Sequence, residues 1–148
     1  KHENIIGIKD STGDIQQLAQ FIRVTQGEDF SILVGTAGAW YPALALGLAG
    51  GVHAAANCSP AAVIAVQEAF LSGDTARARD LYQATCPLNT AVTATYGIAG
   101  LKLACELNGF RGGRVRCPLQ ELDAAARQAV ERINQEANQR FAALGVSV

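Results

Sequence analysis

The stretch that decides the fold of this chain is IIGIKDSTGD, residues 5–14. An apolar run typical of a buried strand ends at Lys9, small polar residues follow, and a helical pattern then begins. An unpaired ammonium group is costly inside a strand, whereas the C-terminal end of a parallel strand is where α/β folds place their chemistry. A desolvated lysine at that point can attack a carbonyl group as a neutral amine. The simpler alternative is a lysine that ends its strand and reaches water.

Strand and helix patterns alternate outward from that stretch. Short apolar runs that predict strands lie at residues 5–8, 31–34 and 51–56. Runs that predict helices lie between them, at residues 14–25 and 40–48, and Ser11 or Thr12 can cap the first helix. Only short loops separate these strand and helix runs, which favours parallel strands joined by right-handed crossovers.

After Pro60 the sequence has only helical patterns. The expected helices lie at residues 61–71, 74–95, 97–108 and 122–144. Asp74 is the expected N-cap of the second of these helices, and a loop rich in glycine and arginine fills residues 111–118. We therefore divide the chain into residues 1–60, which carry the strands, and residues 61–148, which are helical.

The composition fits one soluble globular unit. The 148 residues are 49% hydrophobic, carry a net charge of −1 and offer no basic patch for nucleic acid. The four cysteines form no CxxC pair and the two histidines are far apart, so no metal site is expected. Glycine and proline punctuate the uncharged stretch 30–67, which argues against a membrane-spanning helix. We expect reduced thiols and a cytoplasmic protein, or a mitochondrial one if the source is eukaryotic.

Three parallel strands are too few for a closed barrel, which takes about 250 residues. An open sheet of three strands would leave unpaired backbone groups along its edge. Charged residues make up only 17% of the chain, which is typical of a surface that is partly buried against other protein. Lys1 stands only a short polar step before the first strand, and no signal peptide opens the chain. We expect further protein, upstream or in a second chain, to cover the edge of the first strand.

Three segments of the chain resemble one known family, the dihydrodipicolinate synthase / N-acetylneuraminate lyase family. Residues 6–14, IGIKDSTGD, are similar to its Schiff-base lysine segment. Residues 46–52, LGLAGGV, with Asn57 five residues further on, are similar to its last barrel strand and the approach to it. Residues 100–105, GLKLAC, are similar to its C-terminal helical region. The resemblance, which runs from about residue 4 to residue 122, implies the last three strands of a (β/α)8 TIM barrel followed by an all-helical C-terminal extension.

Within that family the sequence is most similar to 4-hydroxy-2-oxoglutarate aldolase and its bacterial relatives. The segments that carry this similarity are residues 35–38, 89–93, 96–98 and 117–122. Sialic acid lyases have acidic residues after the strand-end glycine, where this chain has Ala37 and Gly38. Dihydrodipicolinate synthases have an Asn-Pro-rich run where this chain reads YGIAG.

The resemblance implies a class I aldolase that forms a Schiff base. Lys9 would attack the C2 ketone of a short 2-oxo acid such as pyruvate, and the protonated imine would accept electrons as the C3–C4 bond breaks. Ser11, Gly35 and the backbone at Val52 would bind the substrate. The resemblance implies no metal and no cofactor, because the iminium cation polarises the substrate.

Other parts of the family's machinery would precede Lys1, namely its tyrosine proton shuttle and its carboxylate-binding Thr/Ser loop. We therefore expect little activity from these 148 residues alone. The alternatives are a dihydrodipicolinate synthase, a 2-keto-3-deoxy sugar acid aldolase or dehydratase, and a non-catalytic fragment with a role in assembly. The expected partners are a 2-oxo acid substrate and further copies of the chain, which form a tetramer by family resemblance, but no nucleic acid and no membrane.

Two further residues have plainer interpretations. Lys102 lies in an expected helix and not at a strand end, so we expect a solvated or interface side chain. His53 follows the expected end of the third strand, and we expect it to be packed and hydrogen-bonded rather than catalytic.

Overall fold

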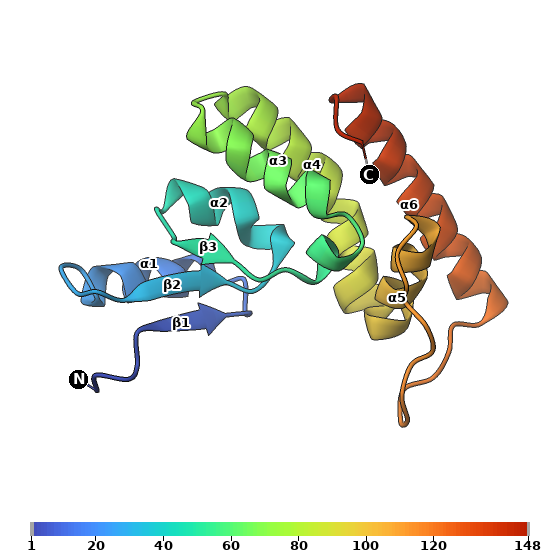
Figure 1. The fold of residues 1–148 in the computed structure, drawn as a ribbon, viewed down its shortest axis with the longest axis horizontal. Helices are drawn as coiled ribbons and strands as arrows, with labels where there is room; N and C mark the ends of the chain where they lie inside the picture. The colour runs from blue at the N-terminus through green and yellow to red at the C-terminus, as the bar shows by residue number, and fades with distance from the viewer. Residues whose placement is uncertain (1, 148) are drawn as a thin grey trace.

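The computed structural model describes residues 2–147, and Figure 1 shows a small parallel sheet on one side and a group of helices on the other. The strands are β1 (Gly7–Asp10), β2 (Ser31–Val34) and β3 (Gly50–Gly51). They are parallel and lie in the order β1-β2-β3. The prediction of three adjacent parallel strands is therefore confirmed.

Two short helices connect the strands. α1 (Ile15–Val24) links β1 to β2, and α2 (Trp40–Ala45), preceded by the 3-10 turn η1 (Ala37–Ala39), links β2 to β3. The N-cap of α1 is Asp14, whose carboxylate accepts hydrogen bonds from two backbone N–H groups of the first turn. The prediction of Ser11 or Thr12 as this cap is therefore wrong.

The first strand lies further along the chain than its apolar run indicates. β1 starts at Gly7, and Ile5 and Ile6 precede it with exposed fractions of 61% and 72%. The expected buried strand at residues 5–8 is therefore wrong in position and in burial. The reason is topological, because within residues 2–147 β1 has a strand neighbour on one side only.

The third strand is shorter than expected. β3 pairs with β2 only at Gly50 and Gly51, and residues Ala54–Asn57 form a 3-10 turn, η2, instead of continuing the strand. A short apolar run does not distinguish a strand from a helical turn, and the three alanines at 54–56 fit the tight turn.

The remainder of the described chain is helical, as expected. The helices are α3 (Pro60–Leu71), α4 (Thr75–Thr90), α5 (Gly97–Leu107) and α6 (Ala124–Ala143), and a π-helical turn, η3 (Ala91–Thr95), follows α4. Asp74 caps α4 by accepting a hydrogen bond from the Arg77 backbone N–H, which confirms the predicted cap. Among the described residues, no helix combines the length and the apolar character needed to cross a membrane.

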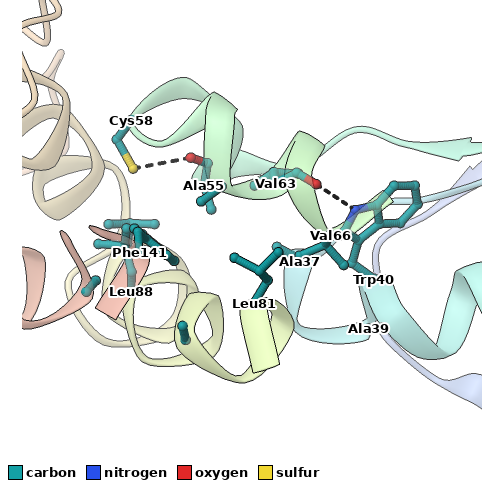
Figure 2. Close-up of a cluster of buried hydrophobic side chains, with 14 of the residues drawn as sticks. Ala37, Ala39, Trp40, Ala55, Cys58, Val63, Val66, Leu81, Leu88 and Phe141 are labelled. Atoms are coloured by element: carbon teal, nitrogen blue, oxygen red, sulfur yellow. Dashed lines mark hydrogen bonds between the residues drawn. The ribbon is translucent and has the colours of Figure 1, made fainter. Parts of the chain in front are cut away.

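One hydrophobic core joins the sheet to the helices. It runs from Leu18 of α1 through Val34 and Trp40 to Phe141 of α6, all of them buried. Figure 2 shows the middle of this core, where the Trp40 indole N–H donates a hydrogen bond of 3.1 Å to the Val63 carbonyl of α3. The helices beyond residue 60 therefore hold the strand-bearing part in place.

Candidate active site

Lys9 is the third of the four residues of β1, with Leu33 of β2 beside it. Alternate residues of a strand point to opposite faces of the sheet, and the buried Asp10 and Val34 point to the helix-covered face. Lys9 and Leu33 therefore point to the other face. No helix of the described residues covers that face, and the Lys9 side chain is exposed.

Ser11 and Gly35 meet Lys9 at the C-terminal ends of the first two strands. A Cβ atom placed on Gly35 would overlap the Ser11 hydroxyl and would lie 2.7 Å from Lys9 Cε. The Gly35 N–H donates a hydrogen bond of 2.6 Å to the Asp10 carbonyl, which fixes the backbone of Gly35 against β1. Only glycine fits at position 35 without moving the lysine or the serine.

Val52 continues the same row of strand ends. Its N–H donates a hydrogen bond of 2.9 Å to the Val34 carbonyl, just as the Gly35 N–H bonds the Asp10 carbonyl. Val52 is 53% exposed. The structure thus brings the four predicted site residues, Lys9, Ser11, Gly35 and Val52, to the C-terminal ends of the strands. Their chemical roles stay predictions.

Asp10 organises the loop after Lys9, a role that the sequence reasoning missed. Its carboxylate accepts hydrogen bonds from the Thr12 N–H at 2.8 Å, from the Thr12 hydroxyl at 3.0 Å and from the Gln17 amide of α1 at 3.1 Å. The signal was present, because an aspartate two residues before a threonine is typical of an Asx turn. This buried carboxylate sets the path of the chain through Ser11.

His53 lies on the opposite, helix-covered face. Its ring fills the space that Gly51 leaves by having no Cβ, and its centroid lies 4.8 Å from that of Trp40. Neither ring nitrogen has a hydrogen-bond partner among the described residues, so the expectation of a packed histidine is confirmed and that of a hydrogen-bonded one is wrong. Burial, and then the charge of Lys9, lower the pKa of His53 to about 4.

Lys102 does not belong to this site. Its ammonium group donates a hydrogen bond of 2.6 Å to the Gly112 carbonyl and so ties α5 to the loop that follows it. The side chain is half-buried and hydrogen-bonded within the chain instead of fully solvated, and a part in an interface stays a prediction.

Comparisons with known proteins agree on one family. The model of the dihydrodipicolinate synthetase family matches residues 1–137. A 4-hydroxy-tetrahydrodipicolinate synthase of Methanoculleus marisnigri is 39% identical over 133 residues, which are 90% of this chain and 46% of that protein.

Solved structures agree with this assignment. The 4-hydroxy-tetrahydrodipicolinate synthase of Methylacidiphilum fumariolicum aligns with a TM-score of 0.88 and 28% identity, over 98% of this chain and 48% of that one. The N-acetylneuraminate lyase of Aliivibrio salmonicida aligns with a TM-score of 0.77 and 26% identity, over 90% of this chain and 44% of that one.

The chain spans about half the length of the curated relatives that it matches. Its three parallel strands and its helices correspond to the C-terminal portion of a (β/α)8 barrel with a helical extension, so the predicted fold class is confirmed. By sequence and by fold, the chain belongs to the dihydrodipicolinate synthetase family.

Proposed function

We propose that the protein containing this chain is a Schiff-base-forming, pyruvate-dependent lyase or synthase in which Lys9 is the nucleophile. The observation that carries this proposal is the convergence at Gly35, where Lys9 Cε and the Ser11 hydroxyl occupy the space of a missing side chain. One volume at the strand ends is therefore lined by the Lys9 amine, the Ser11 hydroxyl and the Gly35 backbone. This arrangement is the one needed to bind and attack a small keto acid.

The chemistry begins with the Lys9 amine in its neutral form. The amine attacks the C2 ketone of pyruvate to give a carbinolamine, which takes up one proton from solvent and loses water, and the protonated imine remains. Loss of a proton from C3 gives an enamine, which can add to an aldehyde carbonyl; the reverse sequence cleaves the C3–C4 bond of a longer 2-oxo acid. Hydrolysis of the protonated imine consumes one water molecule and returns the neutral Lys9 amine and the proton taken up earlier.

The neighbours of Lys9 would bind the substrate. The Ser11 hydroxyl would hydrogen-bond the keto acid, while Gly35 and the Val52 backbone would let it approach the strand ends closely. Residues that transfer the C3 proton and bind the carboxylate would come from protein outside this chain, in line with its coverage of about half of each relative.

The synthase branch of the family is the better supported of the two main branches considered. Curated relatives that are 39%, 35% and 35% identical to this chain carry the name 4-hydroxy-tetrahydrodipicolinate synthase, which was one of the alternatives from the sequence. 4-Hydroxy-2-oxoglutarate cleavage remains the second candidate, because residues 35–38 and 89–93 resemble that branch. Ala37 is 1% exposed and apolar, so it offers nothing to the hydroxyl groups of a sugar substrate.

The test uses the full-length natural protein that contains these residues. Pyruvate followed by borohydride should leave a reduced adduct on Lys9, located by peptide mass spectrometry. Lys9→Arg should abolish the adduct, and Gly35→Ala should reduce it strongly, because the added methyl would collide with Lys9 and Ser11. Gly50→Ala is the matched control, since its methyl would meet only the flexible end of Leu33 at 3.3 Å.

Two substrates then separate the branches. If the protein is a synthase, it should consume pyruvate together with a second substrate. That substrate is an amino acid that carries an aldehyde group and supplies the remaining carbon atoms of 4-hydroxy-tetrahydrodipicolinate. The aldolase reading predicts release of pyruvate from 4-hydroxy-2-oxoglutarate. An adduct on Lys102 alone, or active protein without any adduct, would contradict the assignment of Lys9, and a folded protein with neither adduct nor activity would favour a role in assembly.

A further inference from the structure

The turn that follows Gly35 is held by a helix from far along the chain. The Tyr82 hydroxyl of α4 donates a hydrogen bond of 2.6 Å to the Gly38 carbonyl. One side-chain amide N–H of Asn89, two turns further along α4, donates to the Thr36 hydroxyl oxygen at 3.4 Å. The core beneath is continuous as well, because Leu81 of α4 lies near Ala37 in Figure 2 and both are buried.

Thr36 lies where this helix approaches the loop that carries Ser11. Its hydroxyl oxygen also accepts the Gly38 N–H at 3.2 Å, which caps the 3-10 turn η1. Its methyl group lies 3.3 Å from the position that a Cβ of Gly13 would take, and Gly13 belongs to the loop between β1 and α1. Thr36 thus contacts its own turn and α4 and lies close to the loop after Lys9.

A buried asparagine at position 89 is less favourable than an apolar residue would be if the side chain only filled the core. It is 5% exposed, and its side-chain carbonyl oxygen has no hydrogen-bond partner among the described residues. An unsatisfied buried polar atom costs about 1–3 kcal/mol, which a leucine at the same place would avoid. The contact of Asn89 with Thr36 is the feature that a leucine would not supply.

The Tyr82 hydroxyl is also suited to hold the turn, through its hydrogen bond to the Gly38 carbonyl. Burial, and then Cys86, raise the pKa of Tyr82 to about 12, so its hydroxyl stays protonated and can donate to Gly38 near neutral pH. Because the Gly38 carbonyl is a backbone acceptor, this hydrogen bond acts on the path of the turn itself.

We infer that Thr36 and Asn89 are positioning residues for the reaction at Lys9. Through them, and through Tyr82, α4 holds the turn 35–38 so that the Gly35 backbone stays against Lys9 and Ser11. This inference rests on the proposed function. It assigns to the helical portion a part in the geometry of the site. Lys9 and Ser11 are held by β1 and by the loop that Asp10 fixes, so a shifted turn 35–38 leaves the amine in place to attack pyruvate. The shift alters the backbone beside the imine, where the second substrate must approach, and we therefore expect the larger effect on that substrate.

The test compares four variants of the full-length protein. Thr36→Val keeps the shape of the side chain but removes its hydroxyl, and Asn89→Leu removes the amide. Thr36→Ser restores the hydroxyl. Thr85→Val is the matched control, because within residues 2–147 this buried hydroxyl on the same helix bonds only the Leu81 carbonyl of its own helix, at 2.9 Å.

For Thr36→Val and Asn89→Leu we expect kcat/KM for the second substrate to fall by up to about 100-fold, the effect of a small misplacement near the reacting atoms. Adduct formation with pyruvate and borohydride should stay near the wild-type level. Thr36→Ser and Thr85→Val should both keep wild-type kcat/KM. Equal kcat/KM values in Thr36→Val, Asn89→Leu and Thr85→Val would overturn the inference, as would parallel losses of adduct and activity in variants that fold.

Tyr82→Phe provides a further measurement if Thr36→Val or Asn89→Leu does not fold. It removes one hydroxyl from a half-buried ring and should lower kcat/KM for the second substrate while leaving the pyruvate adduct intact. A folded Tyr82→Phe variant with wild-type kcat/KM would count against the inference. If the wild-type protein itself gives no adduct on Lys9, the proposed function fails instead, and the two failures are thereby distinguished.

Discussion

At the scale of single residues, His53 is a titratable side chain held in apolar surroundings. It is buried against Trp40, without a hydrogen-bond partner among residues 2–147, and on the face of the sheet opposite to Lys9. Protonation would place an unpaired charge in the core. The ring is therefore a packing element that is stable only while neutral.

This residue predicts how stability depends on pH. The pKa of His53 is about 4 in the folded protein and 6.5 without the fold, so the unfolded chain binds more protons between these values. The stabilisation is complete above pH 6.5 and is lost as the pH falls towards 4. At about 1.4 kcal/mol per pKa unit the loss amounts to about 3 kcal/mol.

Urea unfolding of the wild type and of His53→Phe between pH 4 and pH 7 measures this contribution. The difference between the two unfolding free energies should change with pH over that range, whereas carboxylates that titrate in both proteins cancel. His2→Gln serves as the control, because it removes the other histidine of the chain at an exposed position. A parallel pair of curves for the wild type and His53→Phe would contradict the prediction.

At the scale of elements, the helical part depends on a small polar cluster. The Asn108 amide after α5 donates to the Cys58 carbonyl at 2.7 Å and to Asn134 of α6 at 3.2 Å. Its carbonyl oxygen accepts from the amides of Asn134 and Asn138, both at 2.8 Å. Three separate segments, namely the turn before α3, the end of α5 and the middle of α6, thus meet at one side chain.

Asn108→Ala should destabilise the protein by about 2–3 kcal/mol, because the buried Asn134 amide and the Cys58 carbonyl lose partners that water does not replace. Thermal or urea unfolding measures the change. Asn4→Ala is the control, since Asn4 is exposed and its side chain makes no hydrogen bond to the other described residues. If Asn108→Ala and Asn4→Ala both have the unfolding free energy of the wild type, the cluster contributes little to stability.

Sequence patterns predicted the elements correctly where their positions depend on residues that are neighbours in the chain. The helix at 15–24, the strand at 31–34 and the cap at Asp74 agree with the expectation, because periodicity and capping are local signals. β1 was placed two residues too early, since Ile5 and Ile6 read as a buried strand although no described element covers them.

The candidate site was predictable only in part. The Lys9 motif pointed to the strand ends, and the structure brought Ser11, Gly35 and Val52 there. The contact between Thr36 and Asn89 was not predictable, because 53 residues separate the two and one sequence carries no signal for such a pair. The unpaired nitrogens of His53 were missed for the same reason, since they depend on what packs around the ring.

At the scale of the whole molecule, helices cover one face of the sheet, and within residues 2–147 its outer strands, β1 and β3, each have a strand neighbour on one side only. Ile5, Ile6, Ile8 and Val52 are exposed near the strand ends or the free edge of β1, and β1 lies at the margin of the fold in Figure 1. Exposed apolar side chains beside unpaired strand groups favour association with other protein. In the complete barrel of the family, further strands would occupy this position.

The 148-residue chain produced alone should therefore associate, with a sedimentation profile that shifts to larger species as its concentration rises. Ile6→Lys should weaken this association by placing a charge at the exposed edge, as natural edge strands do. Leu71→Lys is the control, because Leu71 is 71% exposed but lies at the end of α3, away from the sheet. A compact monomer at all concentrations would contradict this prediction.

The tie between α4 and the turn 35–38 also bears on how the substrate preference of this protein could change. Because Thr36 and Asn89 share one contact, the effects of substitutions at these two positions should be non-additive, as expected for residues in one network. A library that randomises the turn while Asn89 stays fixed would sample only turn shapes that this amide accepts. Diversifying both segments together opens combinations that neither segment reaches alone, and new specificities should arise there as correlated pairs of substitutions.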